Sequence, residues 1–367
     1  MRTRFVSLAS VASLALALGC TESDPAPQSM DAVVPPDAVS LDDDVLDATV
    51  DAAVTPGTFT AVFIADTHII GPQYSCCSES EGVDNESIMR TPERLARTRA
   101  KINAMVPRPD MVFVLGDIMH DAHHASEVDW YLETPNAFTL AKALFSGFDM
   151  PVHFVFGNHD YEVECDPNHT SYDRDFSHTL FRTFYGADPY GAVHHKGWRF
   201  LLTNGQLGPT WEIGNDACNT EWASYGRTQL NWIAEELDGE EPTVVLSHYM
   251  RLVTAKDEDP EGPHPDLFSL LDARDNVKAV LVGHTHRWID LTLANLDVPH
   301  HVVAATRYDS DNFWTVEFEV DGDQFEILDF DKRIDLSSCS QTWRYDGAPM
   351  SVPEAEEDGD CVFGLGN

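Results

Sequence analysis

The chain has 367 residues, of which 43% are hydrophobic and 23% are charged, a composition typical of a folded globular protein. Its formal net charge is −39, because it contains 62 acidic residues and only 23 basic ones. This balance excludes binding to a nucleic-acid duplex, since no basic surface can meet the phosphates, and an anionic ligand would be repelled unless its site holds a bound cation.

The first twenty residues predict a secretory signal, because Arg2 and Arg4 precede an apolar run too short to span a membrane comfortably. The run ends at Gly19-Cys20, which resembles the lipobox of bacterial lipoproteins, although Ala17 stands where that pattern usually has leucine. We therefore expect residues 1–20 to be a lipoprotein signal peptide, with ordinary signal-peptidase cleavage as the alternative. The protein would be exported and anchored to a bacterial membrane, in the periplasm or at the cell surface, through lipidated Cys20 only.

Residues 21–57 predict a disordered acidic tether. They are rich in Ala, Pro and Asp and contain no Lys, Arg, His, Cys or aromatic residue, so they cannot form a core. Residues 346–367 predict an acidic C-terminal tail. The folded domain is expected to span residues 58–345.

Six cysteines remain besides Cys20: Cys76, Cys77, Cys165, Cys218, Cys339 and Cys361. An even number in an exported chain predicts disulfides, and about 15 pairings are open to six cysteines. The adjacent Cys76 and Cys77 are not expected to join each other, because a ring between neighbouring residues is strained.

From Phe59 onward, short apolar runs alternate with longer amphipathic segments. The runs predict buried strands at 59–65, 111–116, 152–157, 243–247 and 277–283. Helices are expected from Thr91 to Met105, with Thr91 as N-cap and Pro92 at the first helical position, and over 228–237 and 265–273. Further strands are expected at 288–294, 300–305, 313–320 and 325–330. This order predicts an α/β fold in layers.

A polar motif follows each of the five buried strands. The motifs are Asp66-Thr67-His68, Gly116-Asp117, Gly157-Asn158-His159-Asp160, Ser247-His248 and Gly283-His284-Thr285-His286. Ligands bind at the carboxyl ends of strands in open α/β sheets, so five motifs in this position predict one shared site. Each motif alone is weak evidence, but the five together have no simple structural explanation.

The motifs resemble those of the calcineurin-like metallophosphoesterase superfamily, whose pattern reads D-x-H, G-D, G-N-H-[DE], H and G-H-x-H in this order, over about Phe59 to Arg287. The resemblance implies a four-layer αββα sandwich of the metallo-dependent phosphatase type. It implies that Asp66, His68 and His286 hold one metal, that Asn158, His248 and His284 hold another, and that Asp117 bridges both. The catalytic residues would be His159, facing the substrate phosphate without binding metal, and Asp160, behind His159 and orienting it.

The ligand types explain the expected chemistry. Two divalent ions about 3.5–4 Å apart neutralise a phosphoester and turn a water into hydroxide near neutral pH. Imidazole, carboxylate and amide ligands suit Mn, Fe, Zn or Co, of which we favour Mn or Fe. The substrate would be a small-molecule or lipid phosphoester.

The branch of the superfamily is indicated by fewer residues. His120 stands where purple acid phosphatases have a tyrosine, which disfavours a tyrosinate–ferric site. The segments TPERL, GRTQLNWIAEEL and GHTHR are closest to the bacterial cyclic-nucleotide phosphodiesterase-like branch. For the cluster of His120, His123 and His124, a polar loop is favoured over contact with substrate or a third ion.

The leading hypothesis is hydrolysis of a phosphodiester or phosphomonoester outside the cytoplasm. A catalytically silent surface-binding protein on the same fold is one alternative, but the complete ligand set favours an enzyme. The other alternative is an exported phospholipid-cleaving phosphodiesterase, which predicts an apolar rim around the site.

Overall fold

The computed structural model describes residues 57–75, 83–163, 165, 172–255, 258–259, 262–263, 266–290, 298–328, 341–345 and 348–352. The predicted signal peptide, nearly all of the predicted tether, and Cys20, Cys76, Cys77, Cys339 and Cys361 lie outside these residues. None of the helices within the described ranges has the length and apolar character that crossing a bilayer requires.

Five strands form the first sheet in the order β13-β12-β1-β2-β3. Their bounds are β1 Thr58–Ile64, β2 Met111–Leu115, β3 Val152–Val155, β12 Phe313–Glu319 and β13 Phe325–Ile327. The strands β1, β2 and β3 are parallel, whereas β12 is antiparallel to both β1 and β13. Every residue of β2 is buried, because both faces of the sheet are covered, and this explains the unbroken apolar run in the sequence.

Six strands form the second sheet in the order β10-β11-β9-β6-β5-β4. Their bounds are β4 Gly191–His195, β5 Trp198–Leu202, β6 Thr243–Leu246, β9 Val277–Val282, β10 Ile289–Asp290 and β11 His300–Val302. The four central strands are parallel, and the edge strands β4 and β10 are antiparallel to their neighbours.

The two sheets pack face to face through one apolar layer. Phe113 of β2 and Phe200 of β5 belong to different sheets, and their ring centroids are 4.8 Å apart. Phe318 of β12 likewise contacts Trp198 of β5 at 4.9 Å between ring centroids. This interface fixes the two sheets against each other, so that their strand ends lie close together at the edge where the polar motifs lie.

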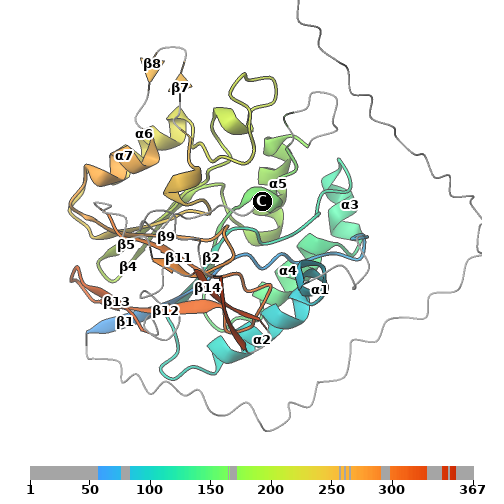
Figure 1. The fold of residues 1–367 in the computed structure, drawn as a ribbon, viewed down its shortest axis with the longest axis horizontal. Helices are drawn as coiled ribbons and strands as arrows, with labels where there is room; N and C mark the ends of the chain where they lie inside the picture. The colour runs from blue at the N-terminus through green and yellow to red at the C-terminus, as the bar shows by residue number, and fades with distance from the viewer. Residues whose placement is uncertain are drawn as a thin grey trace, which may run out of the picture. The chain divides into compact units, whose positions relative to one another are not determined.

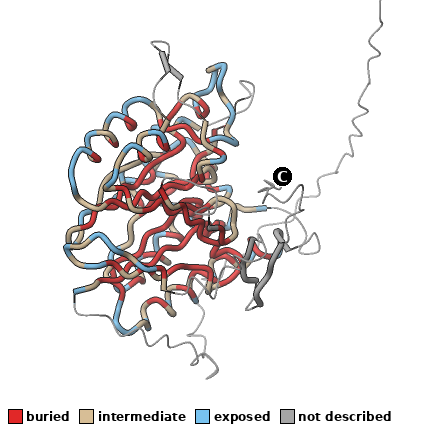
Figure 2. Tube along the Cα trace, turned by 60° about the vertical axis from the view of Figure 1, so that its left-hand side comes forward, coloured by how far each residue is buried: buried red, intermediate tan, exposed pale blue. Residues whose placement is uncertain are grey.

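Helices cover the outer faces of both sheets, as Figure 1 shows. The helices over the first sheet are α2 Thr91–Asn103, α4 Ala137–Phe145 and α5 Arg174–Tyr185, and those over the second sheet are α6 Arg227–Glu236 and α7 Leu267–Asp272. The ring of Phe181 in α5 stacks on Phe156 after β3, with centroids 3.7 Å apart. In Figure 2 the buried trace lies mostly in the interior of the molecule and the exposed trace at its periphery. The predicted four-layer αββα sandwich is confirmed.

Short elements occupy the remaining connections. They are α1 Val83–Met89, α3 Val128–Glu133, η2 Asn158–Asp160, η3 Pro209–Trp211, η4 Arg251–Val253, β7 Glu258–Asp259, β8 Gly262–Pro263, β14 Gln341–Tyr345 and β15 Ala348–Val352. Because β14 pairs with β15, strand structure continues past the domain end predicted at residue 345.

The five strands that precede the motifs form as predicted, but two other expectations need correction. The helix expected at Thr91 begins there, yet its N-cap is Arg90, which makes no side-chain cap bond. The Thr91 hydroxyl instead donates to backbone carbonyls, lying 2.9 Å from the oxygen of His68. The strand expected over 288–294 is present only as β10, and residues 291–297 lie outside the described part.

One disulfide is present among the described cysteines. It joins Cys165 to Cys218, whose Cα atoms are 5.6 Å apart. The bond connects the segment that follows Asn158-His159-Asp160 to the long connection between β5 and α6. The prediction that the chain forms disulfides is therefore confirmed for this pair. The number of cysteines had not determined which of them pair.

Candidate metal centre

The site is built at one edge of the sandwich, where the carboxyl ends of β1, β2 and β3 meet those of β6 and β9. Backbone hydrogen bonds hold the motifs together beyond the strands. His68 N donates to Asp117 O at 2.9 Å, and Gly283 N donates to His248 O at 3.1 Å. The motifs therefore belong to the rigid end of the sheets and do not lie on free loops.

The first half of the cluster consists of Asp66, His68, Asp117 and His286, which can each place a ligand atom within 4.8 Å of the others. His68 Nε2 lies 3.1 Å from His286 Nε2 and 3.5 Å from Asp117 Oδ2. His286 Nε2 lies 3.6 Å from Asp66 Oδ1. These four side chains therefore point their donor atoms at one common position.

The second half consists of Asp117, His248 and His284, again within 4.8 Å of one another, together with Asn158. Asn158 Oδ1 lies 3.0 Å from His248 Nε2 and 3.2 Å from His284 Nδ1. His248 Nε2 lies 3.3 Å from Asp117 Oδ1. Since the other Asp117 oxygen faces His68, this carboxylate is shared between the two halves.

Five residues of the cluster have backbone in the left-handed region, which costs a non-glycine residue about 1 kcal/mol or more. They are Asp66, His68, Asp117, His284 and His286, with φ between 46° and 72°. The sheet-edge hydrogen bonds and the packed strands hold these conformations. Strained backbone of this kind is common at functional sites, and the amino-acid sequence does not reveal which of these residues adopt it.

Two glycines are required because atoms of the cluster approach their backbone. A Cβ added at Gly157 would overlap Asp117 Oδ1 and would lie 2.8 Å from His248 Nε2. A Cβ added at Gly116, whose φ is 87°, would overlap the ring of His248. The glycines that open the Gly-Asp and Gly-Asn-His-Asp motifs therefore make room for the metal-ligating side chains.

The electrostatics of the buried carboxylates call for a cation. Burial and the neighbouring Asp117 raise the pKa of Asp66 well above its ordinary value, although His248 opposes this shift. Burial alone would raise the pKa of Asp117 too, but the charge of His248 holds it well below its usual range. Burial lowers the pKa of His248, and the charge and hydrogen bond of Asp117 outweigh this effect and raise it to about 9.

The other imidazoles of the cluster are in the form that binds metals. Burial lowers the pKa of His284 to about 3, and it lowers the pKa of His68 and of His286 well below the ordinary value. Neutral imidazoles, two buried carboxylates and an amide oxygen together match the ligands of divalent transition metals. The residues present therefore fit a pair of such ions.

A second layer of contacts orients the ligands. His248 Nδ1 lies 2.9 Å from the carbonyl oxygen of Leu115, and His286 Nδ1 lies 3.4 Å from the hydroxyl of Tyr308. Such partners fix which nitrogen carries the proton and so turn the other one toward the metal. Neither partner was predicted, since a backbone carbonyl has no sequence signature and Tyr308 lies far along the chain from its partner.

The two residues expected to be catalytic have different surroundings. The ring of His159 is half-buried beside His68, with ring centroids 4.9 Å apart, and its backbone N donates to Asp117 Oδ1 at 2.9 Å. Among the described residues no hydrogen bond joins Asp160 to that ring, so the structure shows no direct orienting bond of the kind expected. Its carboxylate accepts from the backbone N of Gly157 at 2.8 Å and of Ile118 at 2.9 Å. Asp160 thus positions His159 only through the backbone of the turn.

The three histidines after Asp117 do not form one group. His120 lies at the site, where its Nδ1 is 3.3 Å from His68 Nδ1 and its ring is 4.6 Å from that of His159. His123 is buried away from the cluster and bonds to Ser177 at 3.1 Å. His124 packs near Trp130. His120 therefore lies beside the cluster, and with His68 and His159 it forms a further group whose possible ligand atoms lie within 4.8 Å of one another, while the polar-loop interpretation stays a prediction for His123 and His124.

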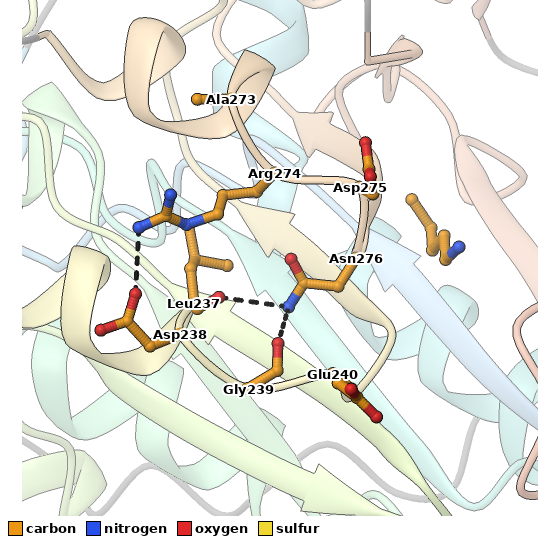
Figure 3. Close-up of a pocket in the computed structure, with 9 residues that line it drawn as sticks. Leu237, Asp238, Gly239, Glu240, Ala273, Arg274, Asp275 and Asn276 are labelled. Carbon is orange, nitrogen blue, oxygen red and sulfur yellow. Dashed lines mark hydrogen bonds and ion pairs between the residues drawn. The ribbon is translucent and has the colours of Figure 1, made fainter.

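A hollow of about 460 Å³ lies at the opposite edge of the second sheet, before β6 and β9 begin (Figure 3). Two of its polar side chains bond to other residues of the lining. Arg274 donates to Asp238 at 3.0 Å, and Asn276 donates to the carbonyl of Gly239 at 2.8 Å. None of the predicted ligands lines it, so it is separate from the metal cluster.

Known proteins resemble this chain in sequence pattern and in fold. The sequence profile of a family described as calcineurin-like phosphoesterase matches residues 59–288. No curated protein matches the chain. A dimetal phosphatase from Danio rerio has a similar structure, with a TM-score of 0.50, 15% identity and coverage of 81% of this chain and 99% of that one. A purple acid phosphatase from yellow lupin shares 14% identity over 72% of this chain and 50% of its own, with a TM-score of 0.41.

Proposed function

Because the chain belongs to the calcineurin-like phosphoesterase family, we propose that it hydrolyses a phosphodiester or a phosphomonoester outside the cytoplasm. It is a metal-dependent phosphoesterase with a cluster of His and Asp groups suited to a pair of metals. The observation that carries the proposal is the position of Asp117, whose two oxygens face the two halves of the cluster.

In this proposal Asp66, His68 and His286 hold one metal, Asn158, His248 and His284 hold the second, and Asp117 bridges them. The ions are Mn, Fe, Zn or Co, because oxygen and imidazole ligands are mixed and this ligand set contains no cysteine, and of these metals we favour Mn or Fe. When bound, a pair of such ions supplies charge neutralisation for the phosphoryl group and a nucleophile at neutral pH.

The burial of the cluster indicates the side from which substrate enters. Asp66, His68 and His248 are fully buried and form the floor. Asn158, His159, His284 and His286 are partly exposed and form the accessible side. His159 is therefore placed to donate a hydrogen bond to the phosphoryl group or to protonate the leaving oxygen, while the floor residues hold the metals.

The exposed apolar side chains favour a substrate with an apolar part as a second candidate. In the described ranges six large apolar side chains are exposed, and five of them belong to connections that begin at the carboxyl ends of strands: Met89, Leu132, Ile213, Trp222 and Leu252. The sixth, Val106, is at the opposite edge. Apolar side chains in these connections would suit a phospholipid-like phosphodiester, whereas the motifs TPERL and GHTHR favour the cyclic-nucleotide phosphodiesterase-like branch.

A hydrolysis screen tests the proposal. The full chain, loaded separately with Mn, Fe, Zn and Co, is assayed on nucleotides, cyclic nucleotides, sugar phosphates, and phospholipids with short and long acyl chains. We expect metal-dependent release of product from one class, and a preference for the longer acyl chains if the exposed apolar side chains contact the substrate. A chain that binds metals but hydrolyses no phosphoester in any of these classes would support the silent binding protein instead.

The extracytoplasmic location rests on Gly19-Cys20 and on the disulfide between Cys165 and Cys218, since disulfides persist in oxidising compartments. We expect Cys20→Ser to move the protein from the membrane fraction to the soluble fraction in a bacterial host that lipidates exported proteins. The matched control is Thr21→Ser, which changes the next residue, leaves the Gly19-Cys20 junction intact and should leave the fractionation unchanged. Membrane retention of Cys20→Ser would refute the lipid anchor.

A further inference from the structure

His68 has partners at both of its ring nitrogens. Its Nε2 faces the cluster, 3.1 Å from His286 Nε2 and 3.5 Å from Asp117 Oδ2. Its Nδ1 faces outward and lies 3.3 Å from Nδ1 of His120. A neutral imidazole that offers its lone pair at Nε2 must carry its proton at Nδ1. The Nδ1–H of His68 must then donate, and Nδ1 of His120 is the acceptor.

His120 is held firmly in the position that this bond requires. The segments after Asp66 and Asp117 continue the parallel pairing of β1 and β2, so that Ile69 forms a bridge with Met119. His120 N donates to Ile69 O at 3.1 Å, at the end of this extension. The ring lies beside those of Tyr74 and His159, with centroids at 5.7 Å and 4.6 Å.

We propose that His120 is a positioning residue for the metal centre. It fixes the tautomer of His68 by accepting its Nδ1–H, and it thereby directs the Nε2 lone pair toward the ion held with Asp66 and His286. The same bond leaves the proton of a neutral His120 on Nε2. In His248 and His286, Nδ1 has a backbone carbonyl and a hydroxyl as its partner. In His68, the partner of Nδ1 is a second imidazole.

This inference rests on the proposed metal centre, and its test is metal affinity, measured on the purified full chain by titration with Mn²⁺ or Zn²⁺ against a chelating dye. His120→Leu removes the acceptor and should weaken one of the two binding steps about 10–100-fold. His120→Asn places an amide oxygen close to the position of Nδ1 and should restore that step nearly to the wild-type affinity. His124→Leu, in the same loop but beside Trp130, should bind both ions as the wild type does.

Each outcome has one meaning. Wild-type affinity for both ions in His120→Leu, or an equal loss in His120→Leu and His120→Asn, would overturn the positioning role while the phosphoesterase proposal stands. A wild-type chain that binds no metal would overturn the proposed function itself. If His120→Leu lowers the unfolding temperature of the metal-free protein, His120→Ala, which also lacks the acceptor, takes its place in the comparison.

Discussion

Replacing Asp117 with asparagine is expected to lower kcat/KM by about 10³-fold or more on every phosphoester that the protein hydrolyses. The carboxylate faces His68 with one oxygen and His248 with the other, so its loss removes the shared anion of both half-sites. An asparagine has the same shape and can still accept from the backbone N of His159, so the fold should be kept. Steady-state kinetics with metal in excess measures the effect.

The control for this variant is Asp121→Asn, which makes the same change of charge four residues later on an exposed side chain. Asp121→Asn should leave kcat/KM unchanged. Equal activities in the two variants would show that Asp117 does not bridge metals. Unfolding temperatures of the metal-free proteins show whether either change acts through stability.

The second large effect is expected for His159→Gln, and it should depend on the leaving group. His159 lies beside the cluster, its ring nitrogens have no hydrogen-bond partner among the described residues, and its backbone is held by Asp117. If its imidazole protonates the leaving oxygen, hydrolysis of alkyl esters should fall by about 10²–10⁴-fold. The loss on a nitrophenyl ester should be much smaller, because that leaving group needs little protonation.

Metal content separates this role from ligation. His159→Gln should keep its metals, whereas His248→Gln should lose metal and activity together on every substrate. If His159→Gln loses activity equally on alkyl and nitrophenyl esters, His159 does not donate a proton to the leaving oxygen. Stabilisation of the phosphoryl charge would then be its role. A His159→Gln protein without metal would instead show that His159 is a ligand.

The strands and the convergence of the motifs could be predicted because they follow from simple patterns. A buried parallel strand reads as an unbroken apolar run, and the first polar residue after it must lie at the carboxyl edge of the sheet. This places Asp66, Asp117 and Asn158 along the first sheet and His248 and His284 along the second. Because the two sheets pack face to face, the residues of the first sheet and those of the second come together at one site.

The features that were missed depend on the three-dimensional neighbourhood. The left-handed backbone of His68 and Asp117 is imposed by sheet-edge hydrogen bonds, and neither residue type signals it. Asp160 was expected behind the ring of His159, but the tight turn directs its carboxylate to backbone N–H groups. His120 was grouped with its neighbours in the sequence, and only the pairing of Ile69 with Met119 places it at His68.

Metal content tests the central claim most directly. The full chain is purified without chelator, supplied with the candidate transition metals, dialysed and subjected to elemental analysis beside Asp117→Asn. Two half-sites that share one carboxylate predict two transition-metal ions per wild-type chain and a large loss in the variant. A wild-type value that stays near zero after supplementation, with the protein folded, would contradict a dinuclear phosphoesterase.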